Sequence, residues 1–573
     1  METLHNGIEL PDIWPPRTVD LDNSQPTPVP WLLKPPAVIP VALGRQLGLG
    51  LFDGGEHTLG LVGDGPLLRG EGVGVCLHPC GEGRQLLVDD FLIESTNLVR
   101  VFHQPVKYPC NPILFAQGPD ERSDAYPHAA LAKCGGAWYD ERDRLFKMWY
   151  MTGYVGYLAF AQSEDGLHWQ RPALDVVPGT NLCLPRDLHP DSGTVWLDRA
   201  SCDPQARFKM LLREPNDQIK RRTGADAGNA PGHLLTSPDG IHWQVRGETG
   251  PMGDRSTMFF NPFRQKWVQS IRSSCARGRS RHYWEYADFL QSGDWQAGQP
   301  IPWAAADAFD LGVDSPPQLY NLDAVPYESL MLGLFQILKG PPNEIGERRA
   351  EPKLTELVLA ISRDGFHWHR PERNAFIGAR RVPGSWEFGY VEPTGGLCLI
   401  VGDELWFTYS AYGGQPERMQ QRGLQSGMYG HGAVGLAKLR RDGFASLEPR
   451  HAGGFLLTRP LLFHGDRLFV NANTAGAPLR AAILEPDGQP VAGLTAEDCL
   501  PLVGNSTCVE LRWKEPAALA AVRGRPVRLR LTLDRGELYS FWLTASPRGA
   551  SGGYLAAGGP GLPGDRDLDC EST

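Results

Sequence analysis

Short apolar runs of five or six residues recur along most of the chain, and each one follows a polar turn. They lie at 145–150, 208–212, 267–271, 330–335 and 405–409. Runs of this length, bounded by turn residues, are typical of buried β-strands, whereas long apolar patterns at helical spacing are scarce here. Residues 527–533 alternate strictly between apolar and polar, which predicts a strand with one buried and one exposed face. The pattern as a whole predicts an all-β protein.

A short phrase that recurs between these runs indicates the architecture. It reads Ser-Glu-Asp-Gly-Leu-His-Trp at 163–169, Ser-Pro-Asp-Gly-Ile-His-Trp at 237–243 and Ser-Arg-Asp-Gly-Phe-His-Trp at 362–368, with weaker copies at 288–295 and 441–444. The Asp-Gly pair suits a tight hairpin, and the Trp that follows can pack back on the sheet. The five aspartates stand 49 to 78 residues apart. Recurrence at this spacing is typical of repeat folds, so five copies predict a five-bladed β-propeller.

The chain divides into four expected parts. Residues 1–82 are rich in proline and glycine and predict a surface arm, followed at 43–82 by an inserted segment that should be partly disordered and deletable. Residues 83–446 would form the five-bladed β-propeller. Residues 447–545, with the alternating strand, predict a C-terminal β-sandwich, and 546–573 predict a flexible tail. We expect the sandwich to pack on the propeller, so that neither moves independently.

Composition and charge argue against several classes of partner. The net charge is −10 and no basic face is evident, so we expect no nucleic acid. No apolar run is long enough to span a membrane, and the start of the chain lacks a secretory leader, which favours the cytoplasm. The 11 cysteines are scattered, without a second pair at zinc-site spacing, which favours free thiols. We therefore expect no metal and no cofactor, and the oligomeric state stays open.

Functional side chains are expected just before the innermost strand of each blade. In a propeller these strands line the central axis, and the loops that precede them surround one of its mouths. The candidates are Asp124, Tyr126 and His128 in the first unit, Asp191 in the second, Asp254 and Arg255 in the third, Asp314 in the fourth, and Trp386, Glu387, Tyr390 and Glu392 in the fifth. Carboxyl groups that share a concave site acquire different pKa values, and one protonated and one ionised group together cleave a glycosidic bond.

Each candidate also has an ordinary structural explanation. Aspartates before strands often cap turns, and aromatic residues such as Tyr126 and Trp386 are common in propeller cores. Arg255 either lowers the pKa of the adjacent Asp254 or forms a plain salt bridge with it. A local arginine cluster favours a solvated loop, with an anion site as the alternative: Arg277, Arg279 and Arg281.

Several of these motifs resemble bacterial five-bladed β-propeller proteins near glycoside hydrolase families 32 and 43. The resemblance covers about residues 83–545 and rests on Leu-Leu-Val-Asp-Asp-Phe-Leu-Ile-Glu at 86–94, Phe-Lys-Met-Trp-Tyr at 146–150, the Asp-Gly hairpins and the C-terminal segment. It implies a carbohydrate substrate and, by position, the roles of nucleophile or base, orienting aspartate and acid for Asp124, Asp191 and Asp254. The family 32 signature Asn-Asp-Pro-Asn-Gly is absent, and those families use glutamate as the third acid, so Glu392 and Glu387 remain alternatives.

Three functions are compatible with these residues. The leading prediction is a glycoside hydrolase whose paired carboxylates at the propeller axis cleave a glycosidic bond. The first alternative is a propeller that binds carbohydrate without cleaving it. The second is a glycoside phosphorylase, in which Arg255 and the arginine cluster would bind inorganic phosphate. We also expect Asp191 and Asp254 to lie in one pocket near the axis, with carboxyl groups roughly 5–10 Å apart.

Overall fold

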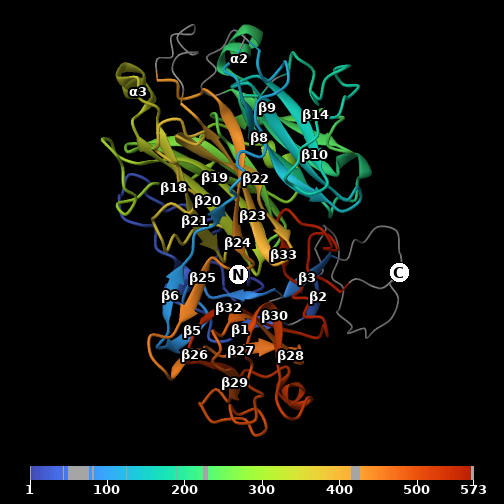
Figure 1. Ribbon diagram of the computed structural model, residues 1–573, viewed down its shortest axis with the longest axis vertical. Helices are drawn as coiled ribbons and strands as arrows, with labels where there is room; N and C mark the ends of the chain where they lie inside the picture. Colours follow the sequence, from blue (N-terminus) through green and yellow to red (C-terminus); the bar gives the residue numbers. More distant parts are fainter. Residues whose placement is uncertain are drawn as a thin grey trace.

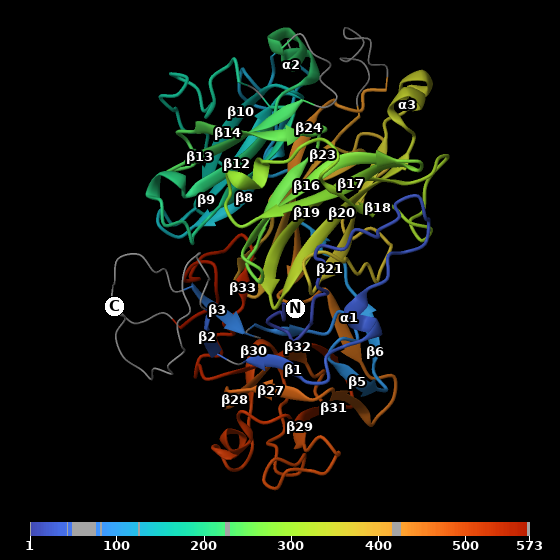
Figure 2. The same ribbon diagram turned by 180° about the vertical axis from the view of Figure 1, so that it is seen from behind.

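The computed structural model describes residues 2–42, 44–48, 76–80, 83–123, 126–188, 190–223, 230–414 and 426–569. Their regular secondary structure is nearly all β-strand, with three short α-helices: α1 (Pro30–Leu33), α2 (Asn216–Thr223) and α3 (Asn343–Arg349). The prediction of an all-β protein is therefore confirmed. An upper body and a lower body follow one another along the long axis of the molecule (Figures 1 and 2). None of the helices in the described ranges is long and apolar enough to cross a membrane.

The upper body begins with a seven-stranded sheet made of two antiparallel meanders. Its strands are β8 (Ala130–Asp140), β9 (Leu145–Thr152), β10 (Tyr157–Ser163), β11 (Ser192–Leu197), β12 (Phe208–Arg213), β13 (Pro231–Ser237) and β14 (Gln244–Pro251). The meanders join through a short parallel contact between β8 and β11. β9 and β12 are buried on both faces, which explains why their sequences are continuous apolar runs rather than alternating ones.

Three four-stranded sheets complete the upper body. The first contains β15 (Thr257–Asn261), β16 (Lys266–Cys275), β17 (Gly278–Tyr286) and β18 (Ile301–Ala305). The second contains β19 (Gln318–Glu328), β20 (Leu330–Gly340), β21 (Leu354–Ser362) and β33 (Tyr554–Leu555). The third contains β22 (Gly389–Val401), β23 (Glu404–Tyr412), β24 (Gly432–Arg440) and β7 (Val106–Lys107). β33 and β7 come from outside the meanders that they extend, so both ends of the chain take part in these sheets.

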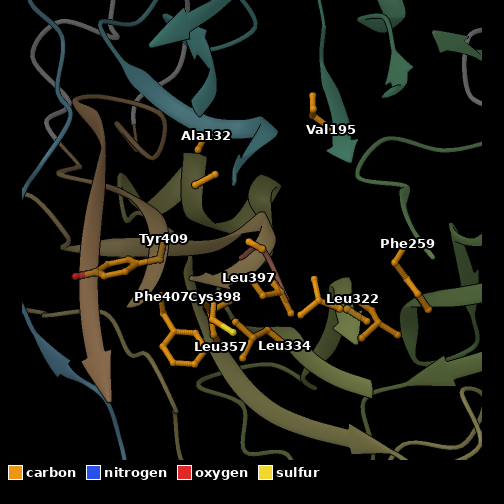
Figure 3. Close-up of a cluster of buried hydrophobic side chains, with 14 of the residues drawn as sticks. Ala132, Val195, Phe259, Leu322, Leu334, Leu357, Leu397, Cys398, Phe407 and Tyr409 are labelled. Carbon is orange, nitrogen blue, oxygen red and sulfur yellow. The ribbon is translucent and has the colours of Figure 1, made fainter. Parts of the chain in front are cut away.

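The first strand of each meander faces the middle of the upper body. β8 contacts β11 and β22, β15 contacts β11 and β19, and β19 contacts β22, so these strands follow one another in a closed order. Figure 3 shows the apolar side chains that they place there, among them Ala132, Val195, Phe259, Leu322 and Leu397. All five are at most 2% exposed. This apolar layer fixes the strands against one another and leaves polar side chains to gather at the strand ends.

The recurring phrase with Asp-Gly directly follows the third strand of its meander. After β10, the Asp165 carboxylate accepts hydrogen bonds from the backbone N–H groups of Leu167 and His168, both at 2.8 Å. Asp239 and Asp364 make the same bonds after β13 and β21. The glycine next to each aspartate has a φ between +73° and +84°, a conformation that favours glycine. These bonds account for the phrase as a structural turn.

Two further sheets form the lower body and enclose a second apolar core. One contains β30 (Asn505–Leu511), β28 (Arg467–Asn473), β32 (Glu537–Thr544), β25 (Ala445–Glu448) and β6 (Val99–Phe102), with β4 (Gln85–Leu86) also paired to β32. The other contains β29 (Leu479–Leu484), β31 (Arg528–Leu533), β26 (Gly454–Thr458) and β5 (Ile93–Thr96). Two separate pairs join β1 (Ile39–Ala42) to β27 (Leu461–Phe463) and β2 (Gly44–Gly48) to β3 (Cys76–Cys80).

The N-terminal residues differ from the expected surface arm. β1, β5 and β6 each pair with a strand from beyond residue 440, and Trp31 is 1% exposed within the lower core. Single apolar residues between prolines therefore supply part of this core, although they follow no strand or helix period. Residues 85–102 accordingly belong to the lower body, whereas we expected them in the upper one. Most of 43–82, the segment predicted to be deletable, lies outside the described residues.

The C-terminal segment differs from the expected flexible tail. β33 pairs with β19, and Leu555 and Ala557 are fully buried against the upper body. The Ser551 hydroxyl donates to Glu328 at 2.7 Å, and both side chains are buried. Gly552 turns the chain with a φ of +72°. Residues 546–569 are thus held between the two bodies, and glycine serves there as a turn residue rather than as a sign of flexibility.

Candidate functional site

The helices α2 and α3 lie at the end of the upper body opposite the lower body (Figure 1). Charged and aromatic residues gather beside them: Arg213 donates to Asn216 of α2 at 2.6 Å, and Asn343 of α3 donates to the Tyr429 hydroxyl at 3.3 Å. We call this group the mouth cluster: Lys133, Tyr154, Asp191, Arg213, Asp254, Arg255, Arg272, Tyr320, Lys353, Tyr390, Glu392, Tyr412 and Tyr429. The Arg255 N–H donates to the Ser192 hydroxyl at 2.9 Å, which joins the starts of β15 and β11. Arg255 and Tyr390 hold left-handed backbones, with φ of 62° and 49°. Such strain costs about 1–3 kcal/mol per residue and concentrates at functional sites.

Asp191 lies directly before β11 and contacts two buried cations. Lys133 Nζ is 3.3 Å from Asp191 Oδ1, and Arg213 Nη1 is 3.6 Å from Asp191 Oδ2. The two cationic side chains are at most 2% exposed, whereas the Asp191 side chain is 15% exposed. Asp191 is therefore the accessible member of this group.

Asp254 is the most accessible carboxylate of the cluster, with 37% of its side chain exposed. Arg272 Nη1 lies 2.5 Å from Asp254 Oδ1. Burial of this region raises the pKa of Asp254, but the charges of Arg272, then Lys133 and Arg213, outweigh it and lower the pKa below its usual range. Asp254 is thus ionised at neutral pH. Because Lys133 and Arg213 also contact Asp191, the two carboxylates share one cationic environment.

The Arg255 side chain does not pair with Asp254, in contrast to our expectation. Its Nη2 lies 3.6 Å from Glu392 Oε1 and donates to Gln336 Oε1 at 3.3 Å. Glu392 is fully buried and accepts a hydrogen bond from the Tyr412 hydroxyl at 3.4 Å. Burial by itself would lower the pKa of Arg255. The negative charge of Glu392 outweighs burial and raises this pKa above its usual value, so the guanidinium stays protonated. Glu392, expected as a catalytic acid, is therefore a buried partner of Arg255 beneath the mouth.

Lys353 is fully buried among tyrosine rings. Its Nζ lies 3.6 Å from the Tyr390 ring centre and 4.9 Å from that of Tyr429, and it donates to the Tyr320 hydroxyl at 3.0 Å. Burial lowers the pKa of Lys353. Burial would raise the pKa of Tyr320, but the Lys353 charge lowers it below its usual value. The pKa values of both groups are therefore lowered, that of Lys353 by burial and that of Tyr320 by the Lys353 charge.

Replacing Lys353 with methionine is expected to raise the pKa of Tyr320, because the positive charge that favours the phenolate is removed. A pH titration followed by the ultraviolet absorbance of phenolate measures this change. The wild-type transition at lowest pH should move to higher pH in Lys353→Met and disappear in Tyr320→Phe.

Lys107→Met is the matched control for this titration. Lys107 Nζ also lies near a tyrosine ring, 5.7 Å from the Tyr409 ring centre, but it donates to Glu387 and to the Gly378 carbonyl. This variant should keep the wild-type transition. A first transition that stays in place in Lys353→Met would contradict the pairing of Lys353 with Tyr320.

Three residues of the first predicted unit have different outcomes. Asp124 lies outside the described residues. Tyr126 packs edge-on against Tyr157, with 6.0 Å between ring centres. His128 comes directly before the residue that bridges to the start of β24. The backbone N–H of Tyr154, a member of the mouth cluster, donates at 2.9 Å to the carbonyl of the residue between Tyr126 and His128, so both lie beside the cluster.

Three other predicted residues are not brought into the cluster. Asp314 has a side chain 65% exposed and pairs at 3.3 Å with an arginine at the end of α3. Glu387 accepts hydrogen bonds from Lys107 Nζ and the Tyr409 hydroxyl, both at 2.8 Å. Trp386 packs on the Tyr409 ring. Asp314 is thus solvated, and Glu387 and Trp386 stabilise the sheet of β22, β23, β24 and β7.

Several members of the cluster were not evident from the sequence: Lys133, Arg213, Arg272, Tyr320 and Lys353. Most lie within a strand or at its end rather than in the loop before an innermost strand. Arg213 is the last residue of β12, and Lys353 comes directly before β21. Because neighbouring antiparallel strands end and begin at the same edge of a sheet, those positions also meet at the mouth. Searching them as well would have found both residues.

Arg279 and Arg281 of the arginine cluster lie on β17, and Arg277 lies in the turn directly before it. Arg281 is fully buried and donates at 2.7 Å to a backbone carbonyl just before β15. The Arg279 guanidinium lies 4.9 Å from the Tyr320 ring centre. Arg277 instead donates to the backbone of residues 21–23. Arg279 and Arg281 therefore add positive charge beneath the mouth, where cations outnumber carboxylates among the described residues.

A separate cleft of about 580 Å³ lies between residues 20–29, the outer strand β18 and the segment 366–373 that follows β21. Five phenylalanine and tryptophan side chains line it: Trp303, Phe309, Phe335, Phe366 and Trp368. The buried acids at its wall, Asp307 and Asp310, pair with Arg370 and Arg373 at 2.6–3.3 Å. These pairs leave neither aspartate available for acid–base chemistry, so the mouth cluster is the stronger candidate.

No family model and no curated protein matches this chain. Among solved structures, it is similar to an N-acetylgalactosamine deacetylase from F. plautii in complex with blood group B trisaccharide (13% identity, 61% of this chain, 96% of that one, TM-score 0.38). It is also similar to a putative glycoside hydrolase from Bacteroides ovatus (13% identity, 59% of this chain, 97% of that one, TM-score 0.38). Another similar structure is the Bombyx mori family 32 β-fructofuranosidase (11% identity, 74% of this chain, 94% of that one, TM-score 0.35). Solved glycoside hydrolases, the group that the sequence resembles, are thus among its distant matches.

Proposed function

We propose that the upper body is a five-bladed β-propeller, that the lower body is a β-sandwich, and that the mouth cluster cleaves a glycosidic bond. The closed order of contacts among β8, β11, β15, β19 and β22 supports the propeller. The two sheets around one apolar core support the sandwich. The observation that carries the function is the pair of accessible carboxylates, Asp191 and Asp254, in one cationic environment at the ends of innermost strands.

Asp254 and Asp191 are the two carboxyl groups that this reaction requires. The lowered pKa of Asp254 keeps it ionised, which suits a base or a nucleophile rather than a proton donor. Asp191 supplies the second carboxyl group, and Asp124 stays a sequence-based candidate for the same reaction. Arg255 and Glu392 act as positioning residues, because their buried pair ties the starts of β15 and β22 together beneath the mouth.

The excess of positive charge favours a second candidate, phosphorolysis of a glycoside. Lys133, Arg213 and Arg272 surround the two carboxylates, and arginine recognises phosphate through paired hydrogen bonds. Inorganic phosphate would then replace water as the group that attacks the sugar. The carboxylates would still be needed to protonate the leaving oxygen and to orient the substrate.

A panel of oligosaccharides and aryl glycosides, incubated with the purified protein with and without inorganic phosphate, tests these proposals. Free sugar released without phosphate supports hydrolysis. Sugar phosphate formed only in the presence of phosphate supports phosphorolysis. A glycan that binds without turnover in either condition would contradict both and leave the carbohydrate-binding propeller as the function.

A further inference from the structure

A histidine and two glutamate side chains meet on one sheet of the lower body, away from the mouth cluster. His103 follows β6, Glu448 ends β25 and Glu537 begins β32, and β25 lies between the other two strands (Figure 1). A ring nitrogen of His103 and one carboxylate oxygen of each glutamate all lie within 4.8 Å of one another. All three side chains are half-buried.

Within the described ranges, no lysine or arginine side chain forms an ion pair with the two carboxylates of this group. Among the described residues, Glu448 bonds the Ser446 hydroxyl at 2.7 Å and Glu537 bonds the Asn473 amide at 3.0 Å, and neither forms an ion pair with lysine or arginine. Many other acids of the lower body have an arginine partner, among them Glu94, Asp466, Glu485 and Glu510. Two carboxylates at this separation repel each other unless a positive charge lies between them.

Neighbouring polar groups hold the three side chains in place. The Ser446 hydroxyl lies 2.8 Å from His103 Nε2 and also donates to Glu448, so it fixes both side chains at once. The Asn473 amide fixes Glu537 in the same way. Hydrogen bonds of this kind orient the ligands of metal sites and tune their affinity.

We propose that His103, Glu448 and Glu537 bind one divalent transition metal ion, of the class to which Zn²⁺ belongs. Imidazole nitrogen with carboxylate oxygen suits Zn²⁺, whereas Ca²⁺ and Mg²⁺ prefer oxygen alone. Bonds of about 2.1 Å require ligand atoms about 3.4 Å apart in a tetrahedron, so a modest closure of the group completes the site. The ion would join strands from the two ends of the chain, which explains why no local sequence motif marks it.

Calorimetric titration of metal-free protein with Zn²⁺ tests the proposal. One ion should bind per chain, and His103→Ala and Glu448→Gln should each weaken the affinity at least tenfold. Zn²⁺ should also raise the melting temperature of the wild type, because a ligand that binds only the folded state stabilises it. His451→Ala, which removes an exposed histidine of the same body, is the matched control and should behave as the wild type.

Three other results of the titration would overturn the proposal. Zn²⁺ that binds equally well to His103→Ala would be held elsewhere, for example at the exposed thiols of Cys110 or Cys202. Absence of binding to the wild type would show that the three side chains form no metal site. Stronger binding of Ca²⁺ than of Zn²⁺ would contradict the class of ion. If His103→Ala does not fold, Glu537→Gln gives the same comparison.

Discussion

The Asp254→Asn variant is expected to lose about 100-fold or more in turnover while its melting temperature changes little. Asparagine has the size of aspartate but acts neither as base nor as nucleophile, and it removes the charge that Arg272 contacts at 2.5 Å. Stability should be nearly unaffected because the Asp254 side chain is 37% exposed. Steady-state kinetics on the glycan that the panel identifies, with circular dichroism as a check on folding, measure both effects.

Asp314→Asn is the matched control for this variant. Asp314 also precedes an innermost strand and also contacts an arginine, but it lies outside the mouth cluster. Asparagine tolerates its left-handed backbone, with a φ of 59°. Wild-type turnover is expected, so equal losses in the two variants, or none in either, would contradict the role given to Asp254.

The Asp442→Asn variant is expected to lower the free energy of unfolding by about 3 kcal/mol or more. Asp442 is fully buried between the two bodies, 3.0 Å from Arg84 Nη1, and accepts hydrogen bonds from Tyr327 at 2.6 Å and Ser540 at 2.7 Å. Burial raises its pKa, but Arg84 and Arg441 outweigh burial and lower the pKa to about 2. The substitution would leave the buried Arg84 without its nearest negative charge, and urea denaturation measures the loss.

Asp165→Asn is the control, because Asp165 has the same place in the repeated phrase but a side chain 50% exposed. It caps two backbone N–H groups, so a loss of about 1 kcal/mol is expected. The Asp442 contribution is fully present above the unfolded pKa of about 3.9. It is lost as the pH falls through about 2, so the difference between wild type and Asp442→Asn should shrink there. Equal losses at neutral pH in both variants would show that Asp442 is an ordinary turn residue.

Much of the strand pattern could be predicted because its causes are local. Strands buried on both faces, such as β9 and β12, need continuous apolar runs, and Asp-Gly marks the turn after a third strand. The copy at 441–444 shows the limit of this reasoning. Its aspartate pairs with Arg84, which is 358 residues away in the sequence, and nothing near Asp442 indicates that contact. The burial of Trp31 likewise depends on a core built from the other end of the chain.

The candidate site could be predicted only in part, for a similar reason. Asp191 and Asp254 precede the short strands β11 and β15 by a few residues at most, so their backbone position places them at the mouth. Glu387 has a comparable place before β22, but its carboxylate pairs with Lys107 of β7, at the outer edge of the sheet, and not with the mouth cluster. Lys133 and Arg272 lie within strands, where an isolated charge resembles any surface residue. These two cations are recognised as part of the site only through Asp191 and Asp254, which lie elsewhere in the sequence.

A crystal structure of the Asp254→Asn variant with a glycan from the panel tests the central claim most directly. The account predicts that the glycan occupies the mouth, with the glycosidic oxygen within roughly 2.6–3.2 Å of the Asp191 carboxyl group, or of a water that it binds. Arg272 and Tyr320 should lie against the bound sugar. A glycan bound in the cleft beside Trp303 and Trp368, with the mouth empty, would contradict it.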